Sequence, residues 1–240
     1  PRVRYHAVKP QSEQDTYTSS NKPEFLISVG SGRSLVPNSV RILADVRVLS
    51  DSSNSASRST GQRTFDRNLG GHAFIDTVNV NFSNLGSIEE NTNYARYVGM
   101  DAIASKNEYD MLNSSNACEL RGVTQVYTTD LCQGITPSLT TGTPVTEDAD
   151  FSLKPLCCLN KMDSRVNGLP MARTGIIRLS IVLADNLDAI FGQAADVNCG
   201  YELRNLRCDF KSVPDSKTPE EVTMCSHQLY TEPTRIGASL

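Results

Sequence analysis

The 240-residue chain is predicted to fold as an all-β protein, an antiparallel jelly-roll β-sandwich with one short helix. Three observations predict this fold. Several segments alternate apolar and polar residues with period two. Residues typical of turns, namely Ser, Thr, Asn and Gly, separate these segments. Finally, the strand-like segments do not alternate with helical ones, as they do in parallel sheets, so we expect about eight antiparallel strands.

The first half of the chain contains a short predicted strand at residues 25–29 and two long ones at residues 40–49 and 73–82. In each long strand the apolar residues share one face, as expected of a strand with one side on a core: Val40, Ile42, Ala44, Val46 and Val48 in the first, and Phe74, Val78, Val80 and Phe82 in the second. Residues 50–70 lack a hydrophobic pattern and are predicted to form a loop.

A turn at residues 86–90 and a helix at residues 91–106 are predicted next, with Thr92 as the helix cap. The helix is indicated by apolar residues at approximately helical spacing. Residues 107–148 are rich in Asn, Ser, Thr and Gly and contain one strand-like piece at 123–127. So long a segment with little regular structure predicts a functional surface excursion.

The second half contains predicted strands at residues 151–159, 175–184 and 201–210, and the start of another at 222–230. Residues 175–184 are apolar on both faces, which indicates a central strand. The alternation changes phase within residues 201–210, which predicts a β-bulge. We therefore expect an extended N-terminal arm at 1–22, a jelly-roll domain at 23–212, and at 213–240 a linker or the start of a second jelly roll.

No catalytic, cofactor-binding or metal-binding residue is predicted, so we expect a protein that is not an enzyme and has no cofactor. The histidines His6, His72 and His227 are far apart and form no metal-binding motif. A GxSxG nucleophile motif is absent. The Gly-rich segment at residues 30–34 resembles the start of a phosphate loop, but it lacks the final Gly-Lys-Ser/Thr and is interpreted as a turn.

The seven cysteines include no CxxC pair and are interpreted as reduced, small apolar residues of a chain that folds in a reducing compartment. Cys118 and Cys132 would be placed to close a loop in an oxidising environment.

The net charge of −4, without a basic cluster, indicates no direct sequence-specific binding of nucleic acid. No apolar run is long enough to span a bilayer. The chain begins with Pro1, so we expect a processed chain or a fragment.

Three stretches, taken in order, resemble the first jelly roll of the double jelly-roll major capsid proteins of icosahedral DNA viruses. The first has an Ile-x-x-Val strand at residues 71–80, a Gly turn with an Ile-Glu pair at 86–90, and Asn93-Tyr94 opening a helix. The second has Pro-Leu within residues 151–156, Leu-Pro at 169–170, and alternating Leu and Ile at 177–184. The third, residues 201–206, is similar to the closing strand of that domain.

The resemblance implies a structural capsid protein of the virion, assembled in the interior of a host cell. It further implies a homo-oligomer in which three copies form a capsomer of an icosahedral shell. The implied partners are neighbouring capsid proteins, with minor capsid proteins or an internal membrane as further contacts. Only residues 213–240 follow the closing strand here, so a single jelly-roll penton or minor capsid protein remains an alternative. A carbohydrate-binding jelly-roll module is another, although the chain has no Trp.

Overall fold

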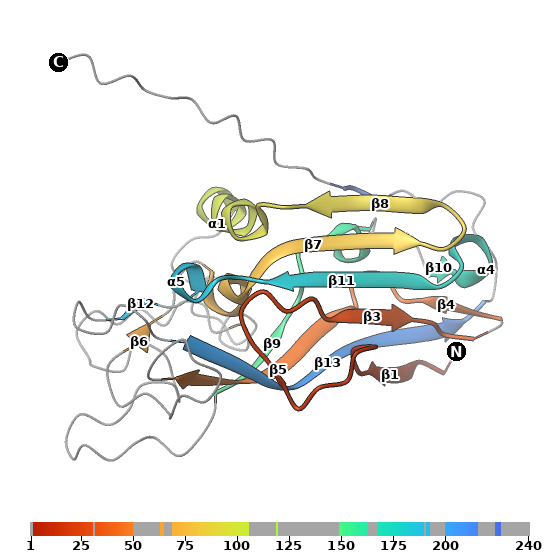
Figure 1. The fold of residues 1–240 in the computed structure, drawn as a ribbon. Coiled ribbons are helices and arrows are strands. Elements are labelled where there is room, and N and C mark those ends of the chain that lie inside the picture. Colours follow the sequence, from red (N-terminus) through yellow and green to blue (C-terminus); the bar gives the residue numbers. More distant parts are fainter. Residues whose placement is uncertain are drawn as a thin grey trace.

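A computed structural model of the chain describes residues 2–30, 32–49, 63–64, 69–105, 119, 149–162, 168–189, 191–192, 200–215 and 224–226. Two antiparallel sheets face each other across one hydrophobic core (Figure 1). This is a jelly-roll β-sandwich, as predicted. The predicted strands at 123–127 and 222–230 lie outside the described residues, apart from 224–226.

The larger sheet is built around β13 (Gly200–Pro214). Its strand order is β10–β4–β13–β5–β9, and β1 and β2 also pair with β13. The partners of β13 are β1 (Arg4–Val8), β2 (Thr16–Tyr17), β4 (Arg33–Leu35) and β5 (Arg41–Leu49), while β9 (Ala149–Leu153) and β10 (Leu169–Pro170) lie at the two ends of the order. Residues 4–8, part of the expected N-terminal arm, are thus extended and hydrogen-bonded into this sheet.

The smaller sheet has the order β3–β11–β7–β8. Its strands are β3 (Glu24–Ile27), β11 (Ile177–Leu183), β7 (Ile75–Phe82) and β8 (Gly86–Asn91). The internal position of β11 confirms the prediction of a central strand. A separate short pair joins β6 (Arg63–Thr64) to β12 (Phe191–Gly192).

Short helices lie at the two ends of the sandwich. The 3-10 helix η1 (Gly70–Phe74) leads into β7. Helix α1 (Tyr94–Ser105) confirms that a helix lies within residues 91–106, but it begins at Tyr94 because Asn91 belongs to β8, so the predicted cap Thr92 lies in the turn before it. In Figure 1, α1 and α5 (Asn186–Ala189) lie at one end, whereas α4 (Met171–Thr174) lies at the other. A second 3-10 helix, η2 (Cys158–Asn160), follows β9.

The alternation of apolar and polar residues in the sequence correctly predicts which side of each strand faces the core. Along β5 the inward residues Ile42, Ala44 and Val46 are buried, and along β11 so are Ile177, Leu179, Ile181 and Leu183. The predicted bulge in β13 is also confirmed, because the pairing with β5 shifts between Arg204 and Arg207. Asn205, within the bulge, has a φ of 50°, a conformation that Asn tolerates better than most residues.

Two local predictions are wrong. Residues 86–90 do not form a turn but belong to strand β8, which pairs with β7; the turn itself lies at residues 83–85. The inward residues Glu89 and Asn91 are polar, so this strand carries no apolar alternation. Strand β9 ends at Leu153 instead of continuing to residue 159, since Pro155 follows and lacks the N–H that a strand ladder needs.

Gly175, which ends α4, occupies a conformation that other residues adopt only with strain. Its φ is 67°, and a Cβ atom there would lie 1.9 Å from Ser83 Oγ. That hydroxyl accepts the Ile176 N–H at 3.0 Å, so moving it aside would break a hydrogen bond. Gly30 has a φ of 81° but nothing within 4 Å of such a Cβ.

We therefore expect Gly175→Ala to lower the free energy of unfolding by about 3 kcal/mol, from backbone strain and overpacking together. Gly30→Ala, the matched control, adds backbone strain alone and should cost about 1 kcal/mol. Urea unfolding of both variants measures the difference. Equal losses for the two variants would show that the Ser83 contact is unimportant.

Candidate functional site

A buried polar network connects η1, α1 and the segment after β9. His72 Nδ1 lies 2.7 Å from the Tyr94 hydroxyl, and His72 Nε2 lies 3.3 Å from Glu119 Oε2. The Tyr94 hydroxyl also accepts the N–H of Leu156 at 2.9 Å. The side chains of His72 and Glu119 are only 1% and 8% exposed, so both ionisable groups are buried.

Glu119 contacts two different elements through its backbone and its side chain. Its carbonyl accepts the N–H of Gly71 at 2.7 Å, and its Oε1 accepts the N–H of Lys154 at 3.0 Å. A Cβ at residue 71 would lie 3.3 Å from the Glu119 carbonyl, so glycine permits the close approach. Glu119 is thereby held against both η1 and the end of β9.

A second buried carboxylate supports the same segment. Glu89 on β8 is 2% exposed, and its Oε2 accepts the N–H of Cys158 at 2.5 Å. Asn160 adds three contacts, since its side chain accepts from Val40 N at 3.2 Å and donates to the carbonyls of Val40 and Pro155 at 3.0 and 2.8 Å. Backbone groups left free by the end of β9 are therefore satisfied by side chains.

The His72 network has the residue types of an acid–base site but not the access. A general base must come within hydrogen-bond reach of a substrate proton, whereas His72 is buried and contacts Tyr94 and Glu119. Neither of the pockets described below is lined by His72, Tyr94 or Glu119. Because its partners include backbone N–H groups of two separate elements, the network acts as a structural clamp.

Three buried cysteines lie in or beside this region, and all three are free thiols: Cys157, Cys158 and Cys208. Burial raises the pKa of Cys157 to about 12, with the Glu89 carboxylate as a second cause. Burial likewise raises the pKa of Cys158 and Cys208. A thiol that stays protonated is a poor nucleophile and metal ligand, so these cysteines pack as small apolar residues. Cys118, Cys132 and Cys199 lie outside the described residues.

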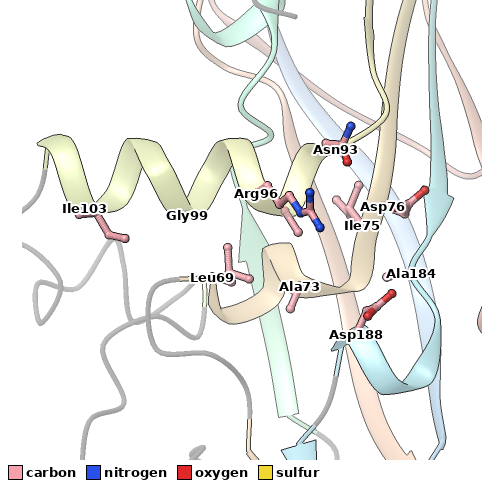
Figure 2. A pocket seen from close by; sticks show the side chains of 11 residues that line it. Leu69, Ala73, Ile75, Asp76, Asn93, Arg96, Gly99, Ile103, Ala184 and Asp188 are labelled. Carbon is pink, nitrogen blue, oxygen red and sulfur yellow. The ribbon is translucent and has the colours of Figure 1, made fainter. Parts of the chain in front are cut away.

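One pocket, of about 450 Å³, lies between η1, α1 and α5 (Figure 2). Its apolar lining includes Leu69, Ile75 and Ile103, and the carboxylates of Asp76 and Asp188 and the guanidinium of Arg96 lie around it. A second pocket of about 360 Å³ lies beside the β13 bulge and is lined mainly by polar residues. Within the described ranges, no three His, Cys, Asp or Glu side chains are grouped so as to hold a metal ion.

The sequence predicted no site residue, and the structure buries two glutamates, Glu89 and Glu119, whose burial the sequence did not indicate. Glu119 lies in a polar stretch and Glu89 in a predicted turn, so no local pattern marked either as buried. Of the histidines, His72 is buried and His6 lies on β1, while His227 falls outside the described residues. Gly30 and Gly32 both have positive φ and lead into strand β4, which confirms the predicted turn before that strand.

No helix in the described part of the chain is long and apolar enough to cross a membrane.

Removing the Tyr94 hydroxyl should destabilise the fold. Tyr94→Phe leaves the Leu156 N–H without that acceptor and His72 without that partner, which should lower the free energy of unfolding by about 1–3 kcal/mol. Tyr97→Phe on the same helix is the control. It removes a half-buried hydroxyl that accepts a hydrogen bond from the ammonium of the partly exposed Lys161, which can bind water instead, so we expect a smaller loss, below about 1 kcal/mol. Similar losses in both variants, measured by urea unfolding, would contradict the clamp.

Alkaline pH should destabilise the chain through its buried thiols. The folded-state pKa of Cys157 is raised from 9.0 to about 12, so its contribution to stability is complete below pH 9 and is lost as the pH rises toward 12. Between pH 8 and about pH 10.5 this one thiol should contribute a loss of about 2 kcal/mol. Urea unfolding of Cys157→Val should show a correspondingly smaller decline. An unchanged decline would show that Cys157 already ionises in the folded state.

Comparison of the sequence with protein-family profiles and with curated proteins gives no match. Comparison of the structure gives matches to solved viral structures. A chain in the structure of the Sputnik virophage matches 92% of the present chain, with 14% sequence identity and a TM-score of 0.52. The mavirus major capsid protein is 9% identical over 90% of the chain, and the capsid of the virus PBCV-1 is 14% identical over 88%, with TM-scores of 0.46 and 0.41.

The match to the Sputnik virophage structure has a TM-score above 0.5 and supports the same overall fold. The chain covers 49% of the matched Sputnik chain and 48% of the mavirus protein, so it spans about half the length of these structures. At this level of identity the likeness concerns the arrangement of the strands. The chain is a jelly-roll β-sandwich whose fold is that of a domain in the Sputnik virophage structure.

Proposed function

We propose that this chain is a structural subunit of an icosahedral viral shell, located in the virion. The observation that carries this proposal is the fold shared with the Sputnik virophage structure over 92% of the chain. The resemblance of three ordered sequence stretches to the first jelly roll of double jelly-roll capsid proteins points in the same direction. Both likenesses extend over the sandwich as a whole.

The rigidity of the sandwich suits a subunit of a shell. Its ionisable core residues stabilise the fold: Glu89 and Glu119 bind backbone N–H groups at one end of β9. The outer face of the larger sheet carries ion pairs, with Arg47 3.0 Å from Glu202 and Arg207 3.3 Å from Asp209. A stiff plate that uses its buried polar groups for rigidity needs no catalytic residue, and the proposed role is accordingly not enzymatic.

The proposed partners are other copies of the chain and neighbouring capsid proteins, with three copies in each capsomer. Repeated modest contacts, summed by symmetry, would hold the shell together. We propose that the chain consists of an arm at 1–22, a jelly-roll domain at 23–212, and a linker or the start of a second jelly roll at 213–240. Coverage of about half of the matched structures is compatible with a second domain of similar size.

One exposed apolar pair is suited to a subunit contact. Leu85 is 61% exposed and Ile176 is 47% exposed. Hydrogen bonds between Ser83 and Ile176, at 3.0 Å in both directions, bring the β7–β8 turn and the start of β11 together. Large apolar side chains that remain exposed on two adjoining segments can belong to an interaction surface.

We expect the purified chain to form trimers or larger shell fragments, as measured by analytical ultracentrifugation. Leu85→Ser combined with Ile176→Ser should weaken this association at least about tenfold while leaving urea unfolding of the subunit nearly unchanged. The paired control Leu85→Met and Ile176→Val keeps both positions apolar and should associate normally. A chain that stays monomeric under all conditions would contradict the proposed role, and a pentamer would favour the penton alternative.

A further inference from the structure

Strand β1 is an edge element held in place by few interactions. Its five residues pair with residues 208–212 of β13, and Tyr5 is 76% exposed above this pairing. By contrast, Tyr17 of strand β2 is buried, and its hydroxyl donates to the Ser12 carbonyl at 2.7 Å. The N–H of Gln11 also donates to the Glu24 carbonyl at 2.8 Å. The chain is therefore anchored from Gln11 to β2, and β1 lies beyond residues 9 and 10.

His6 is the centre of the contacts that hold β1. Its ring stacks on Phe210, with centroids 5.0 Å apart and planes inclined by 7°. Its Nε2 lies 2.7 Å from Ser212 Oγ. The same oxygen accepts Arg33 Nε–H at 2.9 Å, and Arg33 Nη2 donates to the carbonyls of Ser212 at 2.9 Å and Arg2 at 3.2 Å.

These contacts favour a neutral His6. Because the Arg33 guanidinium can only donate, Ser212 Oγ accepts from it and is free to direct its own hydrogen toward His6 Nε2. That arrangement requires an unprotonated Nε2. Burial lowers the pKa of His6 from its ordinary 6.5, and the positive charges of Arg33 and Arg4 lower it further. The contribution of the neutral ring is complete above pH 6.5 and is lost as the pH falls through the lowered pKa.

The other charged groups near β1 have different partners. On β13, Asp209 pairs with Arg207 at 3.3 Å, and Lys211 Nζ lies 5.1 Å from the centre of the Tyr5 ring. Strand β3 also contacts β1, and its Glu24 pairs with Arg178 at 3.0 Å.

Beyond the end of β13, Asp215 accepts a hydrogen bond from the Ser34 hydroxyl. The charges that act on the His6 pKa are those of the cations Arg33 and Arg4. Protonation of His6 therefore adds a positive charge beside two others.

We propose that β1 is an exchangeable strand. Once protonation of His6 breaks its contacts with Phe210 and Ser212, the β1 strand of a second copy can pair with β13 in its place. An identical strand can occupy the same register without any new complementarity, which makes exchange between copies a low-cost route to association. Residues 9 and 10, between β1 and the anchored Gln11, are the segment that would change direction. This proposal concerns pairing between two copies and does not depend on whether the chain builds a shell.

Cross-linking between isotopically distinct copies tests the exchange. Tyr5 and Lys211 lie directly opposite each other and are both exposed, so Tyr5→Cys with Lys211→Cys creates a reporter pair that does not alter His6. Equal amounts of ¹⁴N-labelled and ¹⁵N-labelled full chain are mixed and held at about pH 5 or pH 7.5, on either side of the ordinary pKa of a histidine. Both samples are then returned to pH 7.5 and treated with a short bis-maleimide, and the linked peptide containing residues 5 and 211 is analysed by mass spectrometry.

We expect the acid-treated sample to contain mixed-isotope links, up to about half of the total if exchange is complete. The neutral sample should contain at least about threefold fewer. In the reporter carrying His6→Gln, which cannot gain the charge, the two samples should give equal mixed fractions. Links within single copies alone after acid treatment would overturn the proposal, as would an equal acid response in His6→Gln.

A second measurement keeps the test decisive if the reporter variant folds poorly. Hydrogen exchange of residues 4–8 is followed in the wild-type chain and in His6→Gln at each pH, so that intrinsic exchange rates cancel in the comparison. The ratio of wild-type to variant exchange should rise at least about threefold between pH 7.5 and pH 5. A ratio that stays constant would show that His6 does not hold β1.

Discussion

The pairing capacity of strand β13 is the constraint on which the rest of the structure depends. One edge of this strand binds β5 from Gly200 to Asp209 and β4 at residues 212–214, and the other edge binds β2 and β1 in succession along its length. A single straight register could not serve all of these partners. The bulge at Asn205 shifts the pairing with β5 while Leu203 on one side and Leu206, Cys208 and Phe210 on the other remain buried.

Whereas β13 pairs with several strands, the residues after the end of β9 have no strand partner. A strand that stops inside the protein leaves backbone groups without hydrogen-bond partners in a strand ladder. Side chains from distant parts of the chain satisfy those groups: Glu89 from β8, Tyr94 from α1, Glu119 from the excursion and Asn160 from η2. Burying a carboxylate is costly unless strong hydrogen bonds compensate for lost water. Such residues are therefore suited to fixing one arrangement of the segment and to making the sandwich rigid.

Much of the fold could be predicted from the sequence, because alternation directly reports which side of a strand is buried. Strands β5, β7 and β11, helix α1 and the bulge of β13 all follow from patterns within a few residues of each other. Strand β8 could not be predicted in this way, since its inward residues are Glu89 and Asn91 and its stability depends on the distant partner β7. The pairing of β1 with β13, more than 200 residues away, likewise has no local signal.

The buried network shows why a site is harder to predict than a fold. Glu119 lies among Asn, Ser and Thr residues, in a context typical of exposed loops, and its burial results from contacts with Gly71 and Lys154. The family resemblance contributed what local patterns could not, namely an ordered set of motifs along the chain. That ordered set and the comparison of structures agree on the fold, and together they support the proposed role in a viral shell.

Electron cryomicroscopy of particles that contain this chain tests the central claim most directly. The account predicts that density for the two-sheet sandwich repeats across the faces of an icosahedral shell, with threefold clusters of subunits. Particles in which the chain is absent from the shell, or is present only as an internal component, would contradict it.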